Sequence, residues 1–270
     1  MTNTINAAVN PALANDLLNK ALNEKPTQDT APEIALPSDV TVNLPGGYIT
    51  ATGEVFSTAE VKELNGKDEE AISRATTLGR ALVTILQRGT VKIGSEPATE
   101  QILDQLLIGD RDQLLLGILK ATFGPDVEIL SYCTGCNENK TVNINIQTDI
   151  KTKVLTDPIN DRVFTVTGKN KEFTVKLPNG VIQKKMIENM DKTAAELSTI
   201  ILEGSVIKIG DSPVFSANQV QALSVTDRRK IIDEINGRAP GPQFTDVTVK
   251  CPDCEGEVLV PINLGTLFQF

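Results

Sequence analysis

The sequence contains no histidine, no tryptophan and only four cysteines in 270 residues. Histidine is the commonest general base in enzymes and the commonest metal ligand in proteins. Its absence excludes Ser–His and Cys–His nucleophile systems, and it leaves cysteines or carboxylates to hold any metal ion. No other recurring group completes a catalytic constellation, so we predict a protein that is not an enzyme, and an enzyme remains a remote alternative.

Long basic runs and long apolar runs are also missing. The chain is acidic, with a formal net charge of −9, which disfavours wrapping of a phosphate backbone. Nothing approaches the roughly 20 apolar residues that a membrane-spanning helix needs. Residues 1–10 lack the basic-then-apolar pattern of a signal peptide. We therefore expect synthesis in a cytoplasm, where cysteines stay reduced and favour thiolate ligands over disulfides.

Two halves of the chain repeat the same series of motifs at nearly constant offsets, which indicates an internal repeat with small loop insertions. The recurring pairs are Lys-Ile-Gly at 92–94 and 208–210, Asp-Arg at 110–111 and 227–228, and Cys-x-x-Cys at 133–136 and 251–254. We predict an α+β fold of two tandem related repeats, each made of a hairpin, helices and a Cys-knuckle hairpin. The first repeat spans residues 41–150 and the second spans residues 151–270.

Apolar spacing and turn residues predict matching elements in the two repeats. In the first repeat we expect a hairpin of 41–44 and 48–52 around Pro45-Gly46-Gly47, helices over 68–86, 99–107 and 110–123, and strands over 127–132 and 141–146. In the second repeat we expect a hairpin of 173–177 and 181–184, helices over 193–202, 216–223 and 226–235, and strands over 245–250 and 257–262. The helix over 193–202 is interpreted as a shortened version of the helix over 68–86.

Residues 1–40 are expected to form an extended N-terminal arm and linker. A short amphipathic helix is predicted over residues 11–24, followed by a proline-containing linker up to residue 39. Two interpretations remain: a mobile tail that contacts nothing, or a docking helix that a partner orders. The apolar C-terminal end, from Leu264 to Phe270, either folds back into the core or packs on a neighbour.

The four cysteines form two knuckles, each at the tip of a predicted hairpin: Cys133, Cys136, Cys251 and Cys254. Small turn residues around them let backbone N–H groups point at the sulfur atoms, which favours thiolates. Two facing knuckles supply the ligands of one tetrahedral site, so we predict a zinc-ribbon-like site with one structural zinc ion per chain. Four thiolates leave no open position, so the ion would join the two repeats rather than catalyse.

Three alternatives for the cysteines stay open: a redox dithiol, two disulfides, or cysteines without a metal. The recurring Asp110-Arg111 and Asp227-Arg228 are interpreted as helix N-caps, each with a charged first turn. No catalytic role is assigned to them.

Four segments carry a resemblance to a known family. They are ELNGKDEE at 63–70, LLIGDRDQLLL at 106–116, ATFGP at 121–125 and VKCPDC at 249–254. With the order of elements over roughly residues 40–270, they resemble the phage baseplate hub assembly proteins of contractile-tailed phages. The first knuckle departs from that pattern because it reads Cys-Thr-Gly-Cys without a proline. The resemblance implies a non-enzymatic tail protein, with the four cysteines as the only functional positions carried over.

We therefore expect a structural component of a phage tail baseplate or tail tip, made in the host cytoplasm and located in the virion tail. It would hold neighbouring subunits together through its arm and C-terminus, in multiple copies. Its partners would be other tail and baseplate proteins, without nucleic acid or membrane. Two alternatives are a non-virion assembly chaperone and a zinc-ribbon adaptor for nucleic acid or a polymerase. Acidic residues outnumber Lys140 and Lys250 near the knuckles, which disfavours the adaptor.

Overall fold

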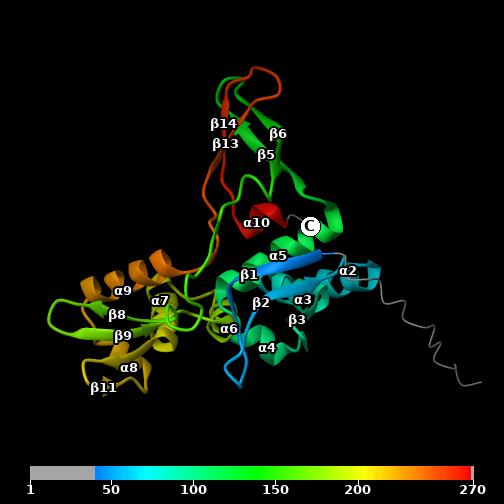
Figure 1. Ribbon diagram of the computed structural model, residues 1–270. Coiled ribbons are helices and arrows are strands. Elements are labelled where there is room, and N and C mark those ends of the chain that lie inside the picture. Colours follow the sequence, from blue (N-terminus) through cyan, green and yellow to red (C-terminus); the bar gives the residue numbers. More distant parts are fainter. Residues whose placement is uncertain (1–39, 269–270) are drawn as a thin grey trace, which may run out of the picture. The chain divides into compact units, whose positions relative to one another are not determined.

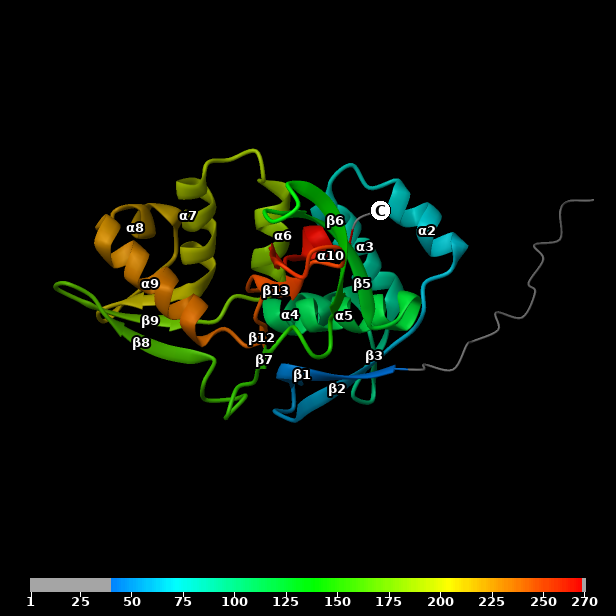
Figure 2. The same cartoon turned by 90° about the horizontal axis from the view of Figure 1, so that it is seen from above.

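The computed structural model describes residues 40–268, which contain two small helix-and-sheet units and a pair of hairpins (Figures 1 and 2). The predicted arm helix and linker, over residues 11–39, lie outside the described residues. Within residues 40–268, no helix is both long and apolar enough to cross a membrane. The mixture of helices and antiparallel sheets confirms the α+β class.

The first unit contains a four-stranded antiparallel sheet with the order β1-β2-β3-β4. Its strands are β1 (Val40–Ile49), β2 (Val55–Val61), β3 (Thr90–Ile93) and β4 (Glu96–Pro97). Two helices connect β2 to β3, α2 (Gly66–Ser73) and α3 (Leu78–Gly89), and two follow β4, α4 (Glu100–Gln105) and α5 (Ile108–Phe123). Side chains of Asn65, Thr77 and Thr99 cap the first three helices by accepting backbone N–H bonds, as short polar side chains do at helix starts.

The second unit has the same strand order, β8-β9-β10-β11, and helices at the same places in the chain. Its strands are β8 (Val163–Thr167), β9 (Glu172–Lys176), β10 (Val206–Ile209) and β11 (Ser212–Pro213). Helices α6 (Gly180–Glu188) and α7 (Ala194–Ser205) connect β9 to β10, and α8 (Ala217–Gln221) and α9 (Val225–Arg238) follow β11. Asn179, Thr193 and Ser224 cap α6, α7 and α9.

A hairpin follows the last helix of each unit. The first consists of β5 (Asp126–Cys133) and β6 (Glu138–Asn145), and the second of β13 (Val247–Lys250) and β14 (Glu257–Val260). The two hairpins lie side by side, with β14 in contact with β5 (Figure 1). A short pair, β7 (Thr152–Lys153) with β12 (Gly241–Pro242), joins the segments between units and hairpins, and α10 (Leu264–Leu267) ends the described chain.

Buried apolar side chains form two separate cores. The smaller core belongs to the second unit, with Leu107 and Leu155 added from outside it. The larger core contains the first unit and both hairpins, and the last turn of the chain adds Leu267 and Phe268 to it. The apolar C-terminal end therefore folds back into the core as far as Phe268, and Phe270 lies outside the described residues.

Most predicted helices and strands are confirmed within a few residues, but both predicted opening hairpins are wrong. Pro45-Gly46-Gly47 lies inside the single strand β1, where the pairing with β2 shifts register between Asn43 and Tyr48. The chain instead turns at residues 50–54, where the Thr50 N–H donates a hydrogen bond to the Glu54 carbonyl. In the second half, residues 181–184 belong to α6, and the partner of β9 is β8.

Three predictions about helices also need correction. The helix predicted over residues 68–86 is two helices, because the chain breaks after Ser73 and Thr77 caps a new helix. The second unit has no shortened helix, since α3 and α7 contain 12 residues each. Asp110 is not an N-cap either: Leu107 occupies that position, and the Asp110 side chain is buried in the first turn of α5.

Candidate metal centre

The four cysteines meet where the two hairpin tips face each other. Cys133 ends β5 and Cys251 directly follows β13, while Cys136 and Cys254 lie in the turns that follow. All four Sγ atoms lie within 4.8 Å of one another. Each cysteine is a free thiol in this structure. The residues that the sequence singled out are therefore brought together, and the cluster could bind a metal ion.

Two of the sulfur–sulfur approaches run between the knuckles. Cys133 Sγ lies 3.7 Å from Cys254 Sγ, and Cys136 Sγ lies 3.7 Å from Cys251 Sγ. A disulfide needs a separation of about 2.05 Å, so neither pair is bonded. Four thiolates at about 2.3 Å from a central ion stand about 3.8 Å apart at the corners of a tetrahedron. The observed separations match that spacing.

The backbone turns in the same way after each knuckle. Asn137 and Glu255, the residues after the second cysteines, both adopt left-handed backbone conformations, with φ of 56° and 55°. In the first knuckle, Gly135 lies so close to the sulfurs that a Cβ there would stand 3.0 Å from Cys254 Sγ. A side chain at this position would press on the sulfur of Cys254, so glycine suits the close approach of the two hairpin tips here.

The electrostatic environment already favours a thiolate at Cys251. Backbone N–H groups of Asp253 and Cys254 lower the pKa of Cys251 to about 7. The neighbouring thiols, Cys254 first, raise the pKa of Cys136 to about 12, because one thiolate disfavours a second beside it. A divalent cation at the centre would remove this conflict, since a coordinated thiol loses its proton.

Polar contacts outside the cluster also connect the two hairpins. Lys140 on β6 forms ion pairs with Glu138 at 2.6 Å and, across the gap, with Asp253 at 2.5 Å. These bonds raise the pKa of Lys140. The Ser131 hydroxyl donates to the Leu259 carbonyl at 3.0 Å. Lys140 is thus engaged by carboxylates, which does not suit a surface that contacts phosphate.

The start of α5 contains a buried cluster of charged residues. From the sequence, only a helix N-cap with a charged first turn is predicted here. The Asp110 carboxylate accepts the Gly46 N–H at 2.6 Å, and Arg111 is 2% exposed and donates to Gln183 of α6 at 2.6 Å. Burial raises the pKa of Asp110 to about 6 and that of Asp112 to about 7. The sequence feature that could have indicated this cluster is the recurrence of Asp-Arg at 110–111 and 227–228. Since no nucleophile accompanies these groups, they join parts of the fold.

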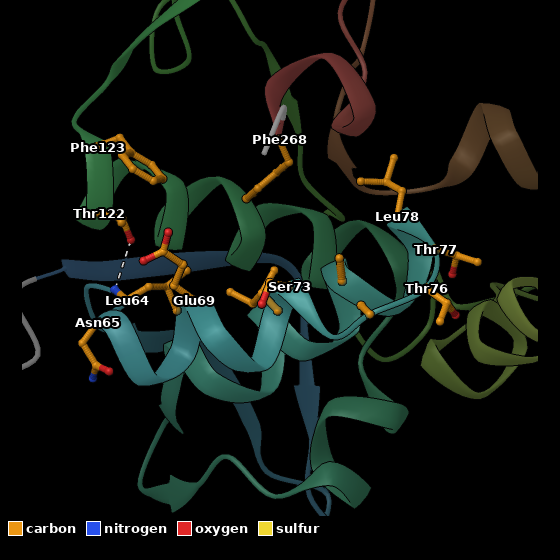
Figure 3. Close-up of a pocket in the computed structure, with 14 residues that line it drawn as sticks. Leu64, Asn65, Glu69, Ser73, Thr76, Thr77, Leu78, Thr122, Phe123 and Phe268 are labelled. Carbon is orange, nitrogen blue, oxygen red and sulfur yellow. Dashed lines mark hydrogen bonds between the residues drawn. The ribbon is translucent and has the colours of Figure 1, made fainter.

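A cavity of about 740 Å³ lies between α2, the start of α3, the end of α5 and Phe268 (Figure 3). Glu69 is the single charged residue among those that line it. The Leu64 N–H donates to the Thr122 hydroxyl at its edge at 3.2 Å. The residues that line the cavity therefore include no acid–base pair. Phe123, at its edge, is 62% exposed.

The fold and the cysteine cluster define an α+β protein whose paired hairpins hold four thiols at one point. A profile of the T4 bacteriophage base plate protein family matches residues 38–269. The chain belongs to this family. No curated protein and no solved structure matches it. Membership confirms the resemblance to phage baseplate proteins and implies a non-enzymatic structural component of the virion tail, with other phage tail proteins as partners.

Proposed function

We propose that the protein is a baseplate component in which one structural zinc ion joins two equivalent repeats. The observation that carries this proposal is the cross-paired cluster: Cys133 with Cys254 and Cys136 with Cys251, both at 3.7 Å. Each half of the chain supplies two of the four ligands. Thiolates in a tetrahedral set suit zinc, and such sites stabilise folds rather than catalyse.

The equivalence of the repeats is supported by their order of elements. Both units have four antiparallel strands in one order, with two helices before the third strand and two after the fourth. A cysteine hairpin then follows each unit. We assign residues 41–150 to the first repeat and 151–270 to the second, with residues 1–40 as an arm. The second cysteine hairpin packs in the larger core, so the repeats interlock.

The metal can be tested on the purified full-length chain. Elemental analysis should give about one zinc ion per chain, and a cobalt-substituted sample should show the absorption of a four-thiolate centre. Replacing Cys136 with Ser should abolish both signals, while replacing the exposed, non-ligand Ser73 with Ala should leave them unchanged. Absence of metal in a protein purified under reducing conditions would contradict the zinc proposal.

In the particle, we propose that the arm holds neighbouring tail subunits, in several copies. The expected role of the C-terminal end is not kept, because Leu267 and Phe268 are buried in the larger core. The docking role of the arm is supported only by the amphipathic leucine pattern of its sequence. Mass spectrometry of purified virions should find this chain among the tail proteins. Its absence from particles whose assembly requires it would favour the alternative, a hub assembly chaperone that leaves before the tail is complete.

A further inference from the structure

One of the contacts between the two repeats inside the chain joins the helix α6 to a bend in the first unit. The bend between α4 and α5, Gln105–Ile108, is called the first elbow. Its Leu106 carbonyl accepts the Gly180 N–H of α6 at 2.9 Å, and its Ile108 N–H donates to the Pro178 carbonyl at 3.3 Å. Arg111 adds its bond to Gln183. A Cβ at Gly180 would stand 2.9 Å from the Leu103 carbonyl oxygen, so α6 packs here because it begins with glycine.

The second repeat has the same bend between α8 and α9, at Ala222–Val225, which is called the second elbow. Counted from the caps of α5 and α9, Leu223 and Val225 are the equivalents of Leu106 and Ile108. Leu106 is buried and its equivalent Leu223 is half-buried, while Ile108 is half-buried and its equivalent Val225 is 65% exposed. Phe215, just before α8, is 84% exposed. The second elbow thus presents apolar side chains where the first elbow is covered.

The first repeat likewise has an equivalent of α6, which is α2. Both helices begin with Asn-Gly, and in both the asparagine is the N-cap. The α6 residues that face the first repeat are Asn179, Gly180, Gln183 and Ile187. Their equivalents on α2, at the same positions from the cap, are Asn65, Gly66, Glu69 and Ser73. All four line the cavity of about 740 Å³, and Figure 3 labels three of them.

Gly66 has no evident purpose within its own chain. Its backbone is not left-handed, and a Cβ there would meet no described atom within 4 Å. Glycine is a poor residue inside a helix, yet this position is the equivalent of Gly180, where close packing of an elbow requires it. The exposed charges are complementary as well: Glu69 and Glu70 on α2 are acidic, and Arg229 near the start of α9 is basic.

We infer that the cavity beside α2 receives the second elbow of another copy of this chain, in the contact that α6 makes with the first elbow inside the chain. This inference rests on the proposed equivalence of the repeats and not on the metal ion. The two contact surfaces differ, so the association is head-to-tail. Such contacts build a ring when the rotation closes and a filament when it does not.

Sedimentation velocity of the full-length, metal-loaded chain over a micromolar concentration range tests the inference. The unaltered protein should self-associate. Gly66→Gln, which obstructs the cavity side, and Val225→Glu, which places a charge on the apolar second elbow, should each weaken association at least about tenfold. Val154→Glu is the matched control, because Val154 is 63% exposed away from both surfaces, and it should associate normally.

Mixing the two impaired variants is the decisive measurement. Val225→Glu retains an intact cavity and Gly66→Gln retains an intact second elbow, so their mixture should form dimers and nothing larger. A monomeric unaltered chain, undiminished association of either variant, or a mixture that stays monomeric would overturn the inference. Elemental analysis of the same samples reports on the metal site, so failure of one proposal is distinguishable from failure of the other.

Discussion

Arg111 and Arg228 make the same hydrogen bond in the two helix-and-sheet units. Each donates from Nη1 to the carbonyl oxygen eight residues earlier, Leu103 at 2.7 Å and Val220 at 3.0 Å. Their remaining donors differ. Arg111 binds Gln183 of the other repeat, whereas Arg228 binds Thr199 within its own repeat at 2.8 Å. One side chain therefore joins the halves, and its counterpart stabilises one half only.

This difference predicts unequal costs of the same substitution. Replacing Arg111 with Met should lower the free energy of unfolding by about 3–5 kcal/mol, because it leaves Asp112 without its cation and removes the bonds to Gln183 and to the Leu103 carbonyl. Replacing Arg228 with Met should cost about 1 kcal/mol, since that side chain is only partly buried. Urea denaturation measures both. Equal costs would contradict the assignment of Arg111 as the contact between repeats, and Arg111→Lys controls for loss of charge alone.

The raised pKa of Asp112 predicts a pH-dependent stability. Its folded pKa of about 7 exceeds the ordinary value of 3.8, so the folded state binds more protons than the unfolded state between these values. Stability then falls as pH rises through this window. Asp112→Asn removes the ionisation, and near pH 8 it should be more stable than the unaltered protein by about 2–4 kcal/mol. The gain should vanish near pH 4. A difference that does not vary with pH would show that Asp112 keeps an ordinary pKa.

Removal of the metal ion should affect the two cores differently. Both hairpins belong to the larger core, while the second unit, with Leu107 and Leu155, forms the smaller one. A strong chelator should therefore raise amide hydrogen exchange in residues 126–145 and 247–260 far more than in the second unit. The Cys251→Ser variant should show the same pattern without chelator. Uniform exchange over both cores would mean that the chain unfolds as one cooperative unit.

The left-handed conformation of Glu255 predicts a stabilising substitution. Side chains with a Cβ are strained at φ near 55°, and glycine is not. Glu255→Gly should raise the thermal stability of the metal-loaded protein by about 0.5–1 kcal/mol. Asn137 occupies the equivalent position, and asparagine tolerates this conformation, so Asn137→Gly should gain less. Calorimetry of the two variants gives the comparison, and a larger gain at Asn137 would count against this strain.

The elements that could be predicted from the sequence are those set by local patterns. Thr99 and Thr193 mark helix starts, and the spacing of the four cysteines indicates two hairpin tips that meet. The elements that could not be predicted depend on distant partners. Gly46 looks like a turn residue, but its N–H bonds to Asp110, 64 residues later, and this contact keeps it within a strand. A charged first turn normally faces solvent, so the burial of Arg111 between two repeats has no local signal.

The composition of the larger core has a consequence for synthesis of the protein. Val258, Val260 and Phe268, at the very end of the described chain, pack with Val42 and Val61 from its beginning. A nascent chain cannot bury these early residues fully until the ribosome has released the last ones. The second unit, with its own core, can fold before that moment. Truncated chains will thus expose apolar surface to cellular proteases, and only complete subunits will persist to be built into a tail.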